Sequence, residues 1–357
     1  MLSHPLFGGS LSVGNENTFT NHEQNYVNQE NVVPSTASTI KERNNAFFFE
    51  YSRPTPIGQL MAGLRYEHVN SDYYEQGVYS PAHSRTYSQW FPSLTFATRI
   101  KEVGLQLSYS AKTSRPSYRQ LGTNVEYMNR FTRQSGNPTL KPETLHNITL
   151  VSSWSWLTFV ANYTQTHNKI MYWNEQESTD ENITNLRYRN FKRFPALTLS
   201  LTAAPRMGVW SPQLILFCQK QWFDIERLGS KLDLSKPIWG ILWNNTFDFK
   251  DNWIAETRLK VTSKGITENS ELTRTTCAFN FSVRKAFLND RLSVTVGVND
   301  LFNRSANQLL LYTNNLSIDT KQEFDSREFY VTLRYKFNTA RSKYKGTGAG
   351  ESERKRF

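Results

Sequence analysis

Residues 329–337 read Phe-Tyr-Val-Thr-Leu-Arg-Tyr-Lys-Phe, with an apolar or aromatic side chain at every odd position. A β-strand points successive side chains to opposite faces, so this stretch gives one apolar face and a second, more polar face. The same alternation recurs at 292–298, 277–283, 103–109 and 62–66. No helical periodicity extends beyond a couple of turns. The chain is therefore predicted to be all-β.

The alternating runs predict about fourteen strands, joined by connections of two length classes. The expected strands are 5–13, 45–52, 59–69, 86–99, 103–113, 145–153, 156–175, 183–204, 209–223, 237–249, 252–264, 271–286, 291–304 and 324–337. Short turns alternate with longer polar connections, at 14–44, 70–85, 114–144, 176–182, 224–236, 265–270 and 305–323. An antiparallel meander with tight turns at one end and long loops at the other is typical of a transmembrane β-barrel. Several strands exceed ten residues, as a tilted bilayer crossing requires.

The composition fits strands that cross a membrane. Hydrophobic residues make up 38% of the 357 residues and aromatic residues 14%, with a mean hydropathy of −0.59. This aromatic content excludes a disordered chain, and the lack of any run of 18 apolar residues excludes a membrane-spanning helix. A membrane-spanning strand shows only every second side chain to lipid, so its hydropathy signal is weak. Aromatic side chains beside the short turns predict a ring at one membrane interface: Trp154, Trp156, Trp210, Phe249, Trp253 and Phe287.

The net charge of +11 does not indicate a nucleic-acid partner. Residues 338–357 hold six basic and two acidic residues, and the remaining excess of positive charge is scattered. Scattered charge is typical of solvated polar faces. We therefore predict a β-barrel segment over 1–337, followed by a flexible basic tail over 338–357.

Two motifs resemble those of TonB-dependent outer-membrane receptors. Gly136-Asn137-Pro138-Thr139-Leu140-Lys141-Pro142-Glu143 resembles their GNPxLKPE signature, and Asn299-Asp300-Leu301-Phe302-Asn303 resembles the NLFN element of a late strand. Stretches 63–67 and 108–118 also resemble sequences that are typical of the same receptors. The end, at 334–338 and 343–350, is similar to Bacteroidetes-type members of the outer membrane protein beta-barrel group. The prolines of 136–143 restrict the backbone and remove N–H donors, so this motif is predicted to be structural, as is the NLFN element.

The resemblance covers essentially the whole chain and implies a function. Such receptors lie in the Gram-negative outer membrane, surrounded by lipid, and take up a nutrient ligand with energy from the TonB system. They have a signal peptide, an amino-terminal plug domain and a 22-stranded barrel. Neither plug nor signal peptide is visible here, so the chain is interpreted as the carboxy-terminal part of such a barrel, with its tail in the periplasm. Siderophore, haem, oligosaccharide, peptide and vitamin ligands all stay compatible with the loops.

Two other functions stay open at the level of sequence. The fourteen strands could close into a smaller, passive outer-membrane channel. The chain could also be a soluble, secreted β-sandwich that binds glycans, although long apolar stripes such as 329–337 argue against it. An enzyme is not expected, because no grouping of acid, base and nucleophile is present.

Tyrosine and arginine side chains in two long loops are the candidate ligand contacts. This mixture suits polar or sugar-like ligands, although the outer loops of barrels are polar and tyrosine-rich in any case. The candidates are Tyr73, Tyr74, Arg115, Tyr118, Arg119, Tyr127, Arg130 and Arg133. The six histidines show no metal-ligand spacing, so neither a metal site nor a cofactor is predicted.

Overall fold

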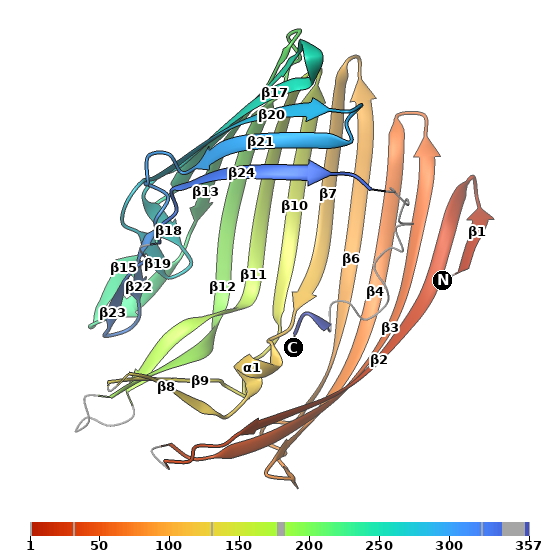
Figure 1. Cartoon of the computed structure of the whole chain (residues 1–357). Helices are drawn as coiled ribbons and strands as arrows, with labels where there is room; N and C mark the ends of the chain where they lie inside the picture. Colours follow the sequence, from red (N-terminus) through yellow and green to blue (C-terminus); the bar gives the residue numbers. More distant parts are fainter. Residues whose placement is uncertain are drawn as a thin grey trace.

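The computed structural model describes residues 2–30, 33–129, 131–176, 183–322, 324–337 and 354–356. Almost all of its secondary structure is β, as predicted. Fifteen strands, each antiparallel to the next, form one curved sheet (Figure 1). In sheet order they are β1 (Leu2–Leu6), β2 (Gly9–Tyr26), β3 (Thr36–Thr55), β4 (Gly58–Glu75), β6 (Arg85–Ile100), β7 (Val103–Ser114), β10 (Glu143–Trp154), β11 (Leu157–Gln176), β12 (Thr184–Ala203), β13 (Trp210–Gln221), β16 (Ile238–Phe249), β17 (Trp253–Thr262), β20 (Thr276–Phe287), β21 (Leu292–Asn299) and β24 (Glu328–Tyr335).

Tight turns and long connections alternate along the sheet, as predicted. Two residues join β3 to β4, β6 to β7, and β10 to β11. A short 3-10 turn, η1 (Lys250–Asn252), joins β16 to β17. Figure 1 shows the tight turns along one rim and the longer connections at the other end of the strands. All long connections therefore share one end of the sheet.

The predicted strand 5–13 is wrong, because a turn divides it into β1 and β2. Phe7 and Gly8 form this turn, with φ angles of 47° and 74°. Two consecutive residues in the left-handed region make the two-residue turn whose twist matches that of antiparallel strands. The division accounts for fifteen main strands where about fourteen were expected.

The predicted loops 14–44 and 70–85 are wrong over much of their length, because β2, β3 and β4 extend into them. β3 has 20 residues, or about 65 Å at the usual rise, roughly twice the thickness of a bilayer's hydrocarbon core. On β3 the positions that share a face with Phe47 become polar beyond the apolar layer, with Thr39, Lys41 and Arg43. The apolar alternation then disappears from the sequence although the ladder of backbone hydrogen bonds continues.

The sheet curves without closing. Among the described residues, β1 pairs only with β2, and β24 pairs only with β21. The strands form one continuous main sheet rather than two packed sheets, which is not the plan of a β-sandwich. A short helix, α1 (Tyr118–Leu121), lies within the curve (Figure 1). We call the face toward α1 the concave face and the opposite face the convex face.

The long connections carry secondary structure of their own. They contain β5 (Val78–Tyr79), β8 (Val125–Asn129), β9 (Thr132–Ser135), β14 (Asp224–Arg227), β15 (Ser230–Asp233), β18 (Gly265–Thr267), β19 (Ser270–Leu272), β22 (Gln308–Tyr312) and β23 (Ser317–Lys321). β14 and β15 form a hairpin, and β18, β19, β22 and β23 form a four-stranded sheet. The predicted longer connections at 224–236, 265–270 and 305–323 thus contain short strands that the sequence did not indicate. Strands of two to five residues are too short for a visible alternation.

Two hydrophobic clusters fix these connections. The first cluster consists of Ile40, Tyr73, Tyr118, Leu121 and Leu140. The second cluster consists of Met171, Trp173, Phe194, Phe223, Ile225, Leu234 and Ile266. Each cluster joins strand residues to loop residues, so it holds the long connections against the sheet.

Candidate functional site

Large apolar side chains cover the convex face of the sheet. Phe47, Trp90, Trp239 and Val331 stand on β3, β6, β16 and β24, and each is between 57% and 72% exposed. Soluble monomers rarely expose contiguous apolar surface on this scale. The convex face therefore suits an apolar environment better than water.

A ring of aromatic side chains lies at the tight-turn end, where the sequence predicts it. Trp154, Trp156, Trp253 and Phe287 are all between 43% and 50% exposed. The ammonium of Lys285 lies 4.9 Å from the ring centroid of Trp253. Amphipathic rings beside a cationic group are typical of the boundary between an apolar layer and water.

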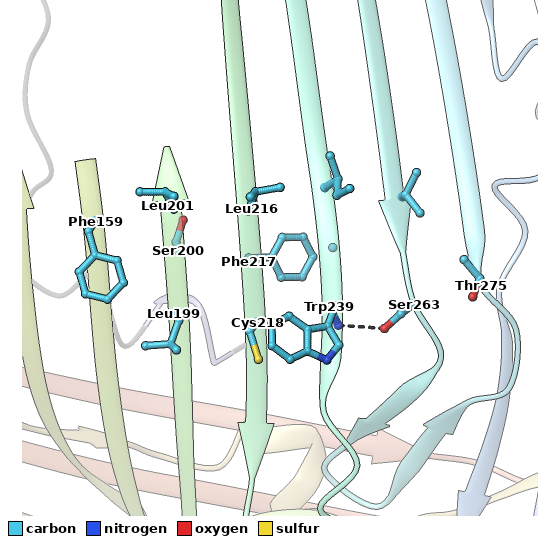
Figure 2. Close-up of a pocket in the computed structure, with 13 residues that line it drawn as sticks. Phe159, Leu199, Ser200, Leu201, Leu216, Phe217, Cys218, Trp239, Ser263 and Thr275 are labelled. Carbon is cyan, nitrogen blue, oxygen red and sulfur yellow. Dashed lines mark hydrogen bonds between the residues drawn. The ribbon is translucent and has the colours of Figure 1, made fainter. Parts of the chain in front are cut away.

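A shallow groove of about 460 Å³ lies along β12, β13, β16 and β17 (Figure 2). Its convex-face lining includes Leu201, Leu216, Cys218, Trp239 and Val261. The lining is almost wholly apolar, so the groove offers few hydrogen-bonding groups to a hydrophilic ligand. It is best described as a depression in the apolar face.

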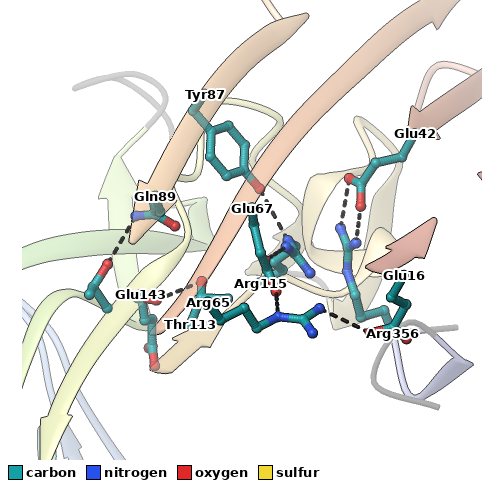
Figure 3. Close-up of polar contacts among 11 residues, drawn as sticks. Glu16, Glu42, Arg65, Glu67, Tyr87, Gln89, Thr113, Arg115, Glu143 and Arg356 are labelled. Carbon is teal, nitrogen blue, oxygen red and sulfur yellow. Dashed lines mark hydrogen bonds and ion pairs between the residues drawn. The ribbon is translucent and has the colours of Figure 1, made fainter. Parts of the chain in front are cut away.

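Charged side chains meet on the concave face, in a partly buried network that we call the Glu67 network (Figure 3). The Nε of Arg65 lies 2.6 Å from Oε1 of Glu67, and an Nη of Arg65 lies 3.0 Å from Glu16. Arg115 pairs with the second oxygen of Glu67 and donates from Nε to the hydroxyl of Tyr87 at 3.2 Å. The side chains of Arg115 and Glu67 are only 6% and 8% exposed. The concave wall is thus polar and ionically cross-linked.

The motif Gly136–Glu143 packs onto the concave face through hydrogen bonds to neighbouring segments. The guanidinium of Arg85 donates to the carbonyl of Pro138 at 2.6 Å and to the carbonyl of Leu140. Asn190 accepts from the backbone N–H of Lys141 at 2.8 Å and donates to its carbonyl at 3.0 Å.

Both ends of the motif are anchored as well. At Gly136 an added Cβ would stand 2.3 Å from the carbonyl oxygen of Gly122, so only glycine fits this close approach. Asn137 donates to the carbonyl of Tyr188 at 2.9 Å. A carboxylate oxygen of Glu143 accepts from the backbone N–H of Ile170 at 2.6 Å. The motif therefore connects the long loop 115–142 to β11 and β12.

The second motif closes the turn after β21. Asn299 donates to Glu328 at 3.1 Å, and Asn303 accepts from Ser326 at 3.1 Å. The amide of Leu301 donates to the carbonyl of Phe279 at 2.9 Å, and the ring of Phe302 lies 5.6 Å from that of Phe279.

Asp300 holds the same turn together with its carboxylate. It accepts from the backbone N–H groups of Arg304 and Ser305 and from the hydroxyl of Ser326, at 2.5–3.2 Å. Burial alone would raise the pKa of Asp300, but these hydrogen bonds outweigh it and lower the pKa below its ordinary value.

The structure disperses the candidate ligand contacts. Tyr73 and Tyr118 are 2% and 0% exposed and belong to the first cluster, and Arg115 belongs to the Glu67 network. The exposed guanidinium of Arg119 pairs with Glu126 at 2.6 Å.

Three of the remaining candidates lie toward the loop surface, and one lies outside the described residues. Tyr127 is 49% exposed, and Tyr74 is half-buried against Tyr79. Arg133, on β9, is half-buried. Arg130 lies outside the described residues. The seven candidates that the structure describes are thus divided among the first cluster, the Glu67 network and the loop surface.

A pocket that the sequence did not indicate lies among the long connections, and we call it the loop-end pocket. Its volume is about 580 Å³. Its lining combines aromatic, charged and amide side chains: Trp173, Arg189, Phe191, Asp224, Glu226, Asn314 and Asn315. Such a mixture of rings and hydrogen-bonding groups suits a polar organic ligand. Its residues come from four separate segments, so no local motif could have revealed it.

The four-stranded sheet beside this pocket carries a titratable hydrogen bond. The hydroxyl of Tyr312 donates to Glu271 at 2.6 Å. Burial and the adjacent carboxylate raise the pKa of Tyr312 to about 12 from its ordinary 10.0. The protonated phenol is therefore favoured in the folded sheet, and its stabilising effect is lost as the pH rises through the folded pKa.

We expect this bond to make stability depend on pH in the alkaline range. The unfolding temperature of the wild type should exceed that of Tyr312→Phe at pH 9, and the difference should shrink between pH 10 and 12. Thermal unfolding in detergent micelles, repeated across this range, measures it. A difference that stays constant to pH 12 would show that the phenol does not titrate with the sheet.

The described residues offer neither a metal-binding cluster nor a membrane-spanning helix. Within the described residues, no group of three or more His, Cys, Asp and Glu side chains is arranged to hold a metal ion. No helix in the same residues is long and apolar enough to cross a membrane.

Comparisons with known proteins agree with the fold. A family model described as "Outer membrane protein beta-barrel family" matches residues 2–335. No curated protein sequence matched the chain. Among solved structures, the chain is similar to the copper transporter OprC, with a TM-score of 0.65 and 13% identity, over 93% of this chain and 55% of that one.

Two further structures show the same likeness. The FrpB iron transporter from Neisseria meningitidis (F3-3 variant) has a TM-score of 0.62 at 13% identity, over 94% of this chain and 53% of that one. A double mutant of the Serratia marcescens hemophore receptor HasR, in complex with its hemophore HasA and heme, has a TM-score of 0.56 at 13% identity, over 92% and 60%. The chain thus spans little more than half the length of these structures, and the likeness is one of fold.

Proposed function

This chain belongs to the outer membrane protein beta-barrel family, and we propose that it forms part of the wall of a receptor that takes up a nutrient with energy from the TonB system. The observation that carries the proposal is the two-sided sheet. Its convex face is apolar and exposed, its concave face is polar and cross-linked by ions, and its long connections all share one end. A wall between lipid and a wet interior needs this arrangement.

The two unpaired edges of the sheet support a wall with further strands. Open strand edges in lipid leave backbone N–H and C=O groups unsatisfied, at several kcal/mol per group. Among the described residues, β1 and β24 each lack a partner on one side. In the proposed receptor these edges pair with additional strands that complete the barrel, and a plug domain faces the concave wall.

The loop-end pocket is the proposed place of ligand capture. It lies among the long connections, which face outward from the cell in such a receptor. The motifs at Gly136–Glu143 and Asn299–Asn303 have a structural role in the proposal, because their contacts are to neighbouring segments. Among the sequence candidates, Tyr127 and Arg119 are exposed on the long loop 115–142, and in the proposal they add ligand contacts.

Binding measurements on the full chain in detergent test the proposal. We would titrate haem, copper(II) and a ferric-iron chelate separately, because the solved barrels of similar fold are a copper transporter, an iron transporter and a receptor in complex with a hemophore and heme. We expect saturable binding of at least one probe. The double variant Asp224→Asn/Glu226→Gln should weaken it about tenfold, which corresponds to about 1.4 kcal/mol.

A matched control stays on the same hairpin. Asp233→Asn removes an exposed carboxylate from β15 outside the pocket lining and should leave the affinity unchanged. The absence of saturable binding for all three probes would contradict capture of these ligand classes. If the double variant and the control weaken the affinity equally, the ligand binds outside the loop-end pocket.

A further inference from the structure

Arg356 is enclosed on the concave face by residues that lie far from it in the sequence. Its two terminal nitrogens donate to the two carboxylate oxygens of Glu42, Nη1 to Oε1 and Nη2 to Oε2, the latter at 3.2 Å (Figure 3). Its Nε donates to the carbonyl of Pro116 at 3.1 Å, and its own carbonyl accepts from the N–H of Tyr118 at 3.0 Å. Only 7% of Arg356 is exposed.

The surroundings of Arg356 match the shape and charge of a guanidinium group. The guanidinium carbon lies 4.4 Å from the ring centroid of Tyr118. The ring of His22 stacks on that of Tyr118, with 4.7 Å between the ring centroids. Glu42 and Tyr118 are 5% and 0% exposed. A carboxylate buried to this degree is costly unless a charged partner satisfies it.

The parts of this enclosure come from separate elements that are held independently. Glu42 stands on β3, whose ladder with β4 runs through this level of the sheet. Tyr118 belongs to α1, whose first turn is closed by reciprocal hydrogen bonds between Ser117 and Gln120. The first cluster then packs Tyr118 against Ile40 and Leu140. Carboxylate, ring and carbonyl are therefore positioned by contacts that do not involve Arg356.

We propose that the concave face carries a binding site for a guanidinium group, made by Glu42, Tyr118 and the carbonyl of Pro116, and that Arg356 of the same chain is its ligand. A planar fork of donors can engage both carboxylate oxygens and a carbonyl while stacking on a ring. An ammonium group is a point charge and cannot satisfy these partners at once. The site thus selects arginyl over lysyl side chains.

Chemical modification of the unaltered protein tests the occupant. Phenylglyoxal reacts with accessible guanidinium groups, and Arg354 is exposed two residues away. In the full wild-type chain in detergent, we expect Arg356 to react at least about tenfold more slowly than Arg354. Mass spectrometry of peptide fragments measures the modification of each arginine. Equal rates for the two arginines would overturn the assignment of Arg356 to this site.

A pair of variants tests the carboxylate. Glu42→Gln should bring the modification rate of Arg356 close to that of Arg354. Glu50→Gln is the matched control, because Glu50 lies on the same face of β3 but is exposed, and it should leave Arg356 protected. Protection of Arg356 that survives Glu42→Gln would overturn the role of Glu42.

A binding experiment tests the ligand class separately. In the full chain with Arg356→Ala, the emptied site should bind N-acetyl-arginine methylamide at least about tenfold more tightly than N-acetyl-lysine methylamide, as isothermal titration calorimetry measures. Equal affinities, or no binding of the arginine probe, would overturn the selectivity. The result is independent of capture at the loop-end pocket, because the two sites share no residue.

Discussion

Replacing Glu67 with Ala is expected to lower the free energy of unfolding by about 3–5 kcal/mol, the usual cost of removing one member of a buried ion pair. The charge at issue is the guanidinium of Arg115, whose side chain is 6% exposed and pairs with Glu67. Arg65 loses its 2.6 Å contact as well but keeps Glu16. Urea unfolding in detergent micelles, followed by tryptophan fluorescence, measures the change.

A double variant shows whether the loss comes from breaking the ion pair of Glu67 with Arg115. Glu67→Ala/Arg115→Met removes both ions, so it should recover part of the stability lost in Glu67→Ala. Glu50→Ala, at an exposed position on the concave face of β3, should change the free energy of unfolding by less than about 0.5 kcal/mol. If the double variant is less stable than Glu67→Ala alone, the pair is not the source of the effect.

Replacing Arg85 with Ala is expected to lower the free energy of unfolding by about 2–6 kcal/mol. Arg85 donates to the carbonyls of Pro138 and Leu140, and both of these residues are buried. Each carbonyl left without a donor costs about 1–3 kcal/mol. Because Leu140 is also part of the first cluster, the long loop 115–142 should loosen together with its hydrogen bonds. Urea unfolding reports the stability, and hydrogen exchange of the α1 amides reports the loosening.

Two comparisons separate this effect from a general loss of charge. Arg85→Lys should recover only part of the stability, because an ammonium group cannot span two carbonyls as a guanidinium does. Arg99→Ala removes an exposed arginine from the tight-turn end of the same strand and should be nearly neutral. Faster hydrogen exchange at α1 in Arg99→Ala as well would contradict a local role for Arg85.

The sequence predicted the strands and the two faces of the sheet better than it predicted the side-chain contacts on the concave face. Alternation predicted that Phe329 to Phe337 form a strand with one apolar face, and the pairing of β21 with β24 agrees. It did not predict the partners of Glu67, because Arg115 lies 48 residues away along the chain. Nor did it reveal that Tyr118 is buried, since a four-residue helix has no detectable period.

The sequence by itself determined the all-β class, the two faces of the sheet, and the end at which the long connections lie. These features follow from a two-residue period and from turn length, which are local properties of the chain. Only the tertiary structure decided which loops carry strands, which carboxylate meets which guanidinium, and where the loop-end pocket forms. Those contacts join segments far apart in sequence, as Glu42 and Arg356 do across 314 positions, and no local pattern encodes them.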